Sequence, residues 1–124
     1  MAMESLSLKG LRALVTGAGT GIGKQIALGF AEAGAEVIFV GRRIEPLEKT
    51  SAIAVKEFGA KVQCIAADVT VADDCARLGR EAGRVDILCN NAGASIYGKW
   101  QNIPMEDWRQ VFAVNVEGPW RLCQ

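Results

Sequence analysis

Short apolar runs and helical patterns alternate along almost the whole of this 124-residue chain. Runs typical of β-strands cover residues 11–16, 37–40, 62–66 and 85–89, and helical patterns follow them at residues 21–34, 45–58, 71–82 and 105–123. Strands and helices that alternate at this spacing form βαβ units around a parallel sheet. The chain is therefore predicted to fold as one α/β domain over residues 1–124.

The order of the strands follows from the hand of their connections. Right-handed crossovers, with a ligand-binding turn after the first strand, predict the order 3-2-1-4 of a Rossmann-type doubly wound sheet. Such sheets normally continue beyond a fourth strand, whereas here the last helical pattern runs to Gln124 without a Gly or Pro stop. We therefore expect a Rossmann domain that is truncated after about four strands and incomplete at its C-terminus, with strand 85–89 at an edge.

Composition and charge exclude several classes of protein. The chain has 14 basic and 14 acidic residues, so it carries no basic field for nucleic acid or a membrane surface. It lacks histidine, and its four cysteines show no CxxC spacing, so no metal site is expected. Residues 1–11 show no signal-peptide pattern, and no apolar run is long enough to span a bilayer. We expect a cytoplasmic protein with reduced thiols.

Glycines crowd the turn that joins the first apolar run to the first helical pattern. Backbone that passes close to a phosphate cannot carry Cβ atoms, and a helix N-terminus attracts an anion. The turn is therefore predicted to hold the pyrophosphate of a dinucleotide, although glycines can also serve a tight turn that binds nothing. The residues assigned to this role are Gly17, Gly19, Thr20, Gly21, Ile22 and Gly23.

The end of the second strand predicts which dinucleotide binds. An NAD site usually places a carboxylate there to bind the ribose 2′-hydroxyl. Gly41 takes that position here, and Arg42 and Arg43 follow it. Because a guanidinium group can pair with a 2′-phosphate, we predict NADP(H) in preference to NAD(H). The alternative is two solvated arginines at the start of a helix.

Further patterns follow in a fixed order along the chain. Asp68-Val69 comes after the third strand, Asn90-Asn91-Ala92-Gly93 after the fourth, and Asn115 lies in the last helical pattern. Together with the Thr-Gly-x-x-x-Gly-Ile-Gly turn, they resemble the short-chain dehydrogenase/reductase family from about Leu8 onward. The resemblance implies an oxidoreductase that transfers hydride between a nicotinamide cofactor and a small ketone or secondary alcohol.

The same resemblance implies roles for individual residues. Asp68 would accept a hydrogen bond from the adenine amino group, with Val69 beside the ring, or Asp68 could simply cap the next helix. The backbone near Asn90, Ala92 and Gly93 would lie along the ribose and nicotinamide, unless it forms a plain loop. Asn115 would distort its helix and hold a water in a proton relay, unless it faces solvent.

The family's catalytic serine, tyrosine and lysine have no match in this chain. Tyr97 is followed four residues later by Gln101 instead of lysine, so it is interpreted as a loop residue at the rim of the site. The resemblance places the missing residues beyond Gln124, and the chain alone is expected to be inactive. The alternative is a stand-alone nucleotide-binding or interaction module without catalysis.

Aromatic side chains cluster near the last helical pattern. They either form a surface for a partner or pack against the part of the fold that is missing from this sequence. The partner would be a second copy in a homo-oligomer or a complementing C-terminal half. The residues concerned are Trp100, Trp108, Phe112 and Trp120.

Overall fold

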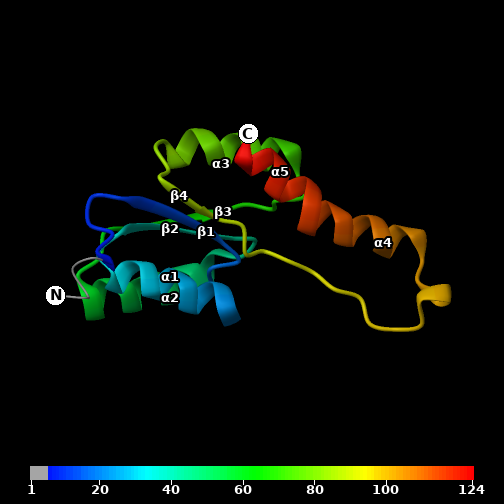
Figure 1. Cartoon of the computed structure of the whole chain (residues 1–124), viewed down its shortest axis with the longest axis horizontal. Helices are drawn as coiled ribbons and strands as arrows, with labels where there is room; N and C mark the ends of the chain where they lie inside the picture. Colours follow the sequence, from blue (N-terminus) through cyan, green and yellow to red (C-terminus); the bar gives the residue numbers. More distant parts are fainter. Residues whose placement is uncertain (1–5) are drawn as a thin grey trace.

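Four parallel strands form the centre of the fold in the order β3-β2-β1-β4 (Figure 1). The structure, a computed structural model, describes residues 6–124. The strands are β1 (Arg12–Thr16), β2 (Glu36–Gly41), β3 (Val62–Ala66) and β4 (Ile87–Cys89). The predicted α/β class and strand order are confirmed.

Helices cover both faces of the sheet. They are α1 (Gly21–Glu32), α2 (Ile44–Phe58), α3 (Ala72–Ala82), α4 (Met105–Phe112) and α5 (Gly118–Cys123). Figure 1 shows α1 and α2 on one face, and α3 and α5 on the other. Strand β2 lies between these two layers, so its residues Val37, Ile38, Phe39 and Val40 are all fully buried. This burial explains why the strand is a continuous apolar run.

Strand β4 begins two residues later than predicted, because the Asp86 side chain takes the place of regular backbone pairing with β1 at this end. The Asp86 carboxylate accepts a hydrogen bond of 2.8 Å from the backbone N–H of Arg12. In return, the backbone N–H of Asp86 donates to the Arg12 carbonyl at 2.8 Å. The regular ladder between β1 and β4 starts only after this exchange, with Ala13 opposite Ile87.

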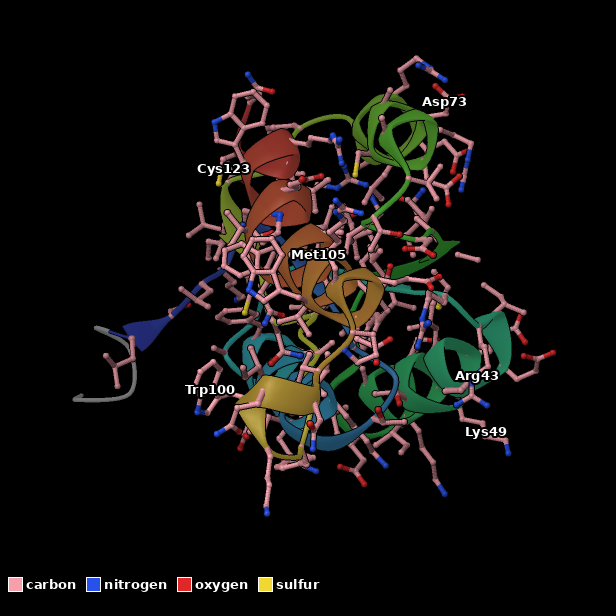
Figure 2. The ribbon with its side chains drawn as sticks, turned by 90° about the vertical axis from the view of Figure 1, so that its right-hand side faces the viewer. Arg43, Lys49, Asp73, Trp100, Met105 and Cys123 are labelled. Carbon is pink, nitrogen blue, oxygen red and sulfur yellow. The ribbon has the colours of Figure 1, made fainter. Side chains whose placement is uncertain are left out.

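The last helical pattern is not one uniform helix. The segment Ala113–Glu117 is π-helical and separates α4 from α5. Beyond it, α5 packs so closely on the loop after β3 that a Cβ atom on Gly118 would lie 2.8 Å from the Val69 carbonyl oxygen. In contrast, α4 projects away from the sheet, and Figure 2 looks toward this end of the molecule, with Met105 near the centre of the view.

Most of the aromatic side chains near the C-terminus are exposed. The Trp108 and Phe112 rings stack with their centroids 4.2 Å apart, yet both remain open to solvent. Trp100 and Trp120 are 79% and 63% exposed. This exposure agrees with both alternatives, a partner surface or a face that a further part of the fold covers.

Two other features concern the described residues as a whole. None of the helices in residues 6–124 has the length and apolar character needed to cross a membrane. Over the same residues, no three His, Cys, Asp or Glu side chains gather into a group that could hold a metal ion.

Candidate dinucleotide-binding site

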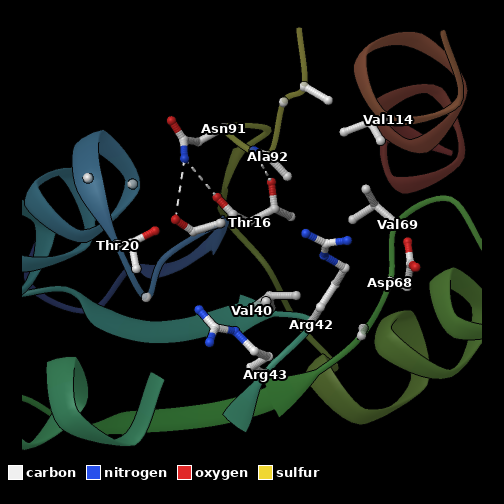
Figure 3. A pocket seen from close by; sticks show the side chains of 18 of the residues that line it. Thr16, Thr20, Val40, Arg42, Arg43, Asp68, Val69, Asn91, Ala92 and Val114 are labelled. Atoms are coloured by element: carbon white, nitrogen blue, oxygen red, sulfur yellow. Dashed lines mark hydrogen bonds between the residues drawn. The ribbon is translucent and has the colours of Figure 1, made fainter. Parts of the chain in front are cut away.

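A cleft of about 580 Å³ lies where the carboxyl ends of the parallel strands meet (Figure 3). This is the edge at which open α/β sheets bind their ligands, and the volume is in the range of cofactor sites. Its walls come from the turns after β1, β2, β3 and β4 and from α4 and the π-helical segment. The residues that line it are Thr16, Gly17, Gly19 to Gly23, Val40 to Arg43, Pro46, Leu47, Ala67 to Thr70, Asn91 to Ala94, Gln110 and Val114.

The glycines of the first turn serve different physical purposes. Gly17 and Gly21 have φ angles of +65° and +55°, a region that side chains with a Cβ atom rarely adopt. Gly23 has ordinary helical backbone, but a Cβ atom there would lie 2.0 Å from the Gly17 carbonyl oxygen and 2.3 Å from Asn91 Nδ2. Around Gly21 such an atom would meet no other group within 4 Å, so the cleft itself stays open there.

The N-terminus of α1 opens into this cleft without a protein cap. Thr20 occupies the N-cap position, yet its side chain makes no capping hydrogen bond within residues 6–124, and the first turn holds no acidic residue. The backbone N–H groups of that turn are therefore available to an anion, with the positive end of the helix dipole behind them. Ile22, which is 75% exposed, places an apolar side chain beside them.

A hydrogen-bonded seam joins the glycine turn to the loop after β4. The Asn91 amide nitrogen donates to the carbonyl oxygens of Thr16 and Gly17, at 3.1 and 3.4 Å. The buried Thr16 hydroxyl accepts from the backbone N–H of Ala92 at 2.9 Å. Both contacts appear as dashed lines in Figure 3. These hydrogen bonds fix the position of the loop after β4 relative to the glycine turn.

The end of β2 has the pattern that the sequence indicates. Gly41 lines the cleft without a side chain, and Arg42 extends its guanidinium group into the middle of it (Figure 3). Arg43 is the N-cap residue of α2 and lines the same side of the cleft. The end of β2 therefore offers two guanidinium groups and no carboxylate to a ligand phosphate.

The Asp68 carboxylate is oriented by its own loop. Its Oδ1 atom accepts from the backbone N–H and the hydroxyl of Thr70, at 2.9 and 2.7 Å. The Thr70 hydroxyl bond, supported by the nearby Arg42 charge, lowers the pKa of Asp68 against the opposing effect of burial. The group is thus an ionised acceptor at neutral pH. The N-cap position of α3 belongs to Val71, so the alternative that Asp68 caps this helix is wrong.

Asn115 lies in the π-helical segment and clamps the far end of the same loop. Its Oδ1 atom accepts from the backbone N–H of Ala94, and its Nδ2 atom donates to the Ala94 carbonyl, both at 2.8 Å. Asn115 is exposed to solvent, as the alternative expects, but its side chain also binds the Ala94 backbone. Segments of π-helix are often found at functional sites, because they realign side chains within a helix.

The structure brings nearly all of the predicted cofactor residues to one cleft. Asn90 is the exception: it does not line the cleft, and its amide nitrogen lies 3.5 Å from Cys123 Sγ. Tyr97 is 93% exposed and lies outside the lining of the cleft as well.

The sequence motifs include Asn91 but assign it no place in the site, and they give no role to the Thr16 hydroxyl; these two groups hold the loop. Gln110 and Val114, which line the cleft from α4 and the π-helical segment, were missed. The double Asn was a visible signal, but its spacing does not say which amide turns inward.

Comparison with known proteins assigns the chain to a family. The model of a family described as short chain dehydrogenase matches residues 12–124. The chain belongs to the short-chain dehydrogenase family. The chain is 37% identical over 120 residues to tetrahydroxynaphthalene reductase of Pyricularia oryzae, a match that covers 93% of this chain and 42% of the reductase.

Solved structures of short-chain dehydrogenases have the same fold. One short-chain type dehydrogenase/reductase, from Mycobacterium marinum, is 35% identical with a TM-score of 0.88, covering 100% of this chain and 52% of that one. L-sorbose reductase from Gluconobacter frateurii, complexed with NADPH and L-sorbose, is 30% identical with a TM-score of 0.88. The match covers 99% of this chain and 47% of the reductase. The chain spans about half the length of these relatives.

Proposed function

We propose that this chain forms the NADP(H)-binding part of an oxidoreductase that interconverts a small ketone and the corresponding secondary alcohol. Bound NADP(H) would supply or accept the hydride. The Gly17–Gly23 turn and the uncapped start of α1 fit a pyrophosphate, and the ionised Asp68 fits the adenine amino group. The solved complex of L-sorbose reductase with NADPH and L-sorbose, a ketose, supports this choice of cofactor and substrate class.

The observation that carries the choice of NADP(H) is the position of Arg42 in the cleft beside the bare Gly41. A guanidinium group attracts a 2′-phosphate, whereas the carboxylate typical of NAD sites would repel it. Asn115 would contribute to catalysis by holding the loop at Ala94 against the π-helical segment. We propose a cytoplasmic location as well, which agrees with four cysteines that form no disulfide within residues 6–124.

Replacing Arg42 tests the cofactor choice. In Arg42→Leu, we expect NADPH to bind about ten- to a hundredfold more weakly and NADH almost unchanged, because one charge-assisted hydrogen bond is worth about 1.5–3 kcal/mol. Fluorescence titration of the reduced nicotinamide measures both ligands. Gly41→Asp is a poorer test, since a Cβ atom at Gly41 would lie 3.2 Å from the buried Leu47.

Arg80→Leu is the matched control for this experiment. Arg80 is an exposed arginine in the last turn of α3, and it does not line the cleft. Its loss changes the net charge equally, so the NADPH affinity should stay within about twofold of the unmodified chain. Equal affinities of the unmodified chain for NADPH and NADH would refute the preference.

The chain by itself should bind cofactor without turning over substrate. General acid–base catalysis contributes about 10²–10⁴-fold, and Tyr97 is followed four residues later by Gln101 instead of the lysine that would assist a catalytic tyrosine. We expect at most trace oxidation of NADPH with a panel of small ketones, in a sample shown by titration to bind NADPH. Robust turnover that Tyr97→Phe removes would instead make Tyr97 the catalytic acid.

A further inference from the structure

Helix α3 holds the backbone on both sides of Ala67, at the end of β3. On one side, Arg77 Nη2 donates to the Ala66 carbonyl oxygen at 2.7 Å. On the other side, Asp74 Oδ2 accepts from the backbone N–H of Asp68 at 2.8 Å. Ala67 itself is buried and lines the cleft. Two side chains of one helix thus fix the point at which the chain leaves the sheet.

The two α3 side chains are also paired with each other. Arg77 Nη2 lies 3.5 Å from Asp74 Oδ1, and Arg77 Nη1 lies 3.3 Å from Glu81 Oε2. Asp74 and Arg77 are each only about a third exposed, at 32% and 36%. Because Arg77 Nη2 also bonds the Ala66 carbonyl oxygen and Asp74 Oδ2 also bonds the Asp68 N–H, the pair cannot rotate without breaking a bond to the β3 end.

What this pair holds in place is the Asp68 carboxylate. The Asp68 backbone is set by Asp74, and its Oδ1 atom is occupied by Thr70. Oδ2 receives no hydrogen bond from any residue in the range 6–124, and Asp68 lines the cleft. In Figure 3, Asp68, Val69 and Val114 form one wall of the pocket, across from Thr20 and Asn91. One carboxylate oxygen is thus left free at a fixed position on this wall.

We propose that Asp74, braced by Arg77, is a positioning residue that sets the Asp68 carboxylate for recognition of an exocyclic amino group on the adenine of the cofactor. This inference rests on the proposed function. Asp74 touches no ligand in this scheme, since its Oδ2 atom is engaged with the Asp68 backbone and its Oδ1 atom faces Arg77. Asp74 acts by fixing the orientation of the Asp68 carboxylate and its position in the cleft.

The test uses a pair of ligands that differ in one amino group. NADPH carries the 6-amino group of adenine, and its purine analogue carries a hydrogen atom in place of that group. Because a hydrogen bond to a charged acceptor strengthens binding, we expect the full chain to bind NADPH at least about tenfold more tightly than the analogue. Fluorescence titration of the reduced nicotinamide, which both ligands share, gives the ratio of the two affinities.

In Asp74→Ala we expect the affinities for NADPH and for the analogue to differ by no more than about twofold, because the Asp68 carboxylate is no longer held in place. Asp73→Ala is the matched control: Asp73 is an acid of the same first turn of α3, and it lies on the outer side of the helix in Figure 2. It should keep the ratio of the unmodified chain. Asp74→Asn should rescue much of the ratio, since its amide oxygen can still accept from Asp68.

A purely structural role predicts a different pattern. With such a role, Asp74→Ala would weaken the binding of both ligands equally and leave the ratio of their affinities unchanged. That result would overturn the proposal. If Asp74→Ala does not fold, Asp74→Glu keeps the charge near Arg77 but moves the acceptor by one methylene. The proposal requires a lowered ratio there, together with faster hydrogen exchange of the Asp68 backbone amide without ligand.

Titration of the unmodified chain separates loss of cofactor binding from loss of amino-group recognition. If the unmodified full chain binds neither ligand, the proposed function is refuted, and this inference with it. If it binds both ligands equally well, cofactor binding stands, and the role of Asp68 and Asp74 in reading the amino group is refuted.

Discussion

Gly23→Ala should abolish NADPH binding and destabilise the fold. The added Cβ atom would lie 2.0 Å from the Gly17 carbonyl oxygen and 2.3 Å from Asn91 Nδ2, so the turn, the helix or the Asn91 loop must move. Overpacking of a tight interior contact typically costs about 1–3 kcal/mol, and here backbone must yield, so we expect at least about 3 kcal/mol. Urea unfolding and calorimetry with NADPH measure the two effects.

Gly29→Ala provides the control within the same helix. A Cβ atom there meets no other group within 4 Å, and the residue lies in the interior of α1. Alanine is favoured over glycine in a helix by about 0.5–1 kcal/mol, so this variant should be slightly more stable and should bind NADPH normally. An unaltered NADPH affinity in Gly23→Ala would show that the contact between α1 and the glycine turn is not needed for binding.

Thr16→Val should produce the second large effect. The substitution keeps the shape of a side chain that is buried at the end of β1, but it removes the acceptor of the Ala92 N–H. A donor left without a partner costs about 1–3 kcal/mol, and the loop after β4 would no longer be fixed at the cleft. We therefore expect a loss of about 2 kcal/mol in the free energy of unfolding and roughly tenfold weaker NADPH binding.

Thr50→Val separates this effect from the general loss of a buried hydroxyl. Thr50 is equally buried, and its hydroxyl donates to the carbonyls of Pro46 and Gly19, at 3.0 and 3.4 Å. Valine there leaves no N–H group without an acceptor, so stability should fall by less than about 1 kcal/mol. If the two variants behave alike, the bond between Thr16 and Ala92 has no special role.

Local patterns predicted most of the fold. Helix α2 ends at Gly59 in the left-handed conformation, with φ of +62°, as a glycine after an amphipathic stretch indicates. Strand β2 is recognisable because both of its faces are buried, which requires an unbroken apolar run. The order of the strands then follows from the right-handed crossover, a rule that holds for parallel sheets in general.

The candidate site was predictable to the extent that single turns define it. The Gly17–Gly23 turn and the step from Gly41 to Arg42 line the cleft as expected, because backbone freedom and side-chain charge are properties of the residues themselves. Asn90 and Asn91 could not be separated in this way, since the sequence does not say which amide turns toward β1.

Contacts between distant segments depended on the tertiary structure alone. Thr16 and Ala92 meet across 76 positions of sequence, because β1 pairs with β4 in one register that brings Val15 beside Cys89. The resemblance to the family implied a distorted helix at Asn115, but the contact of its amide with the Ala94 backbone came from the tertiary structure. The sequence by itself thus determined the elements, their order and the chemistry available at each strand end. Which side chains share the cleft was decided by register and helix packing, because a shift of one residue turns a side chain to the other face.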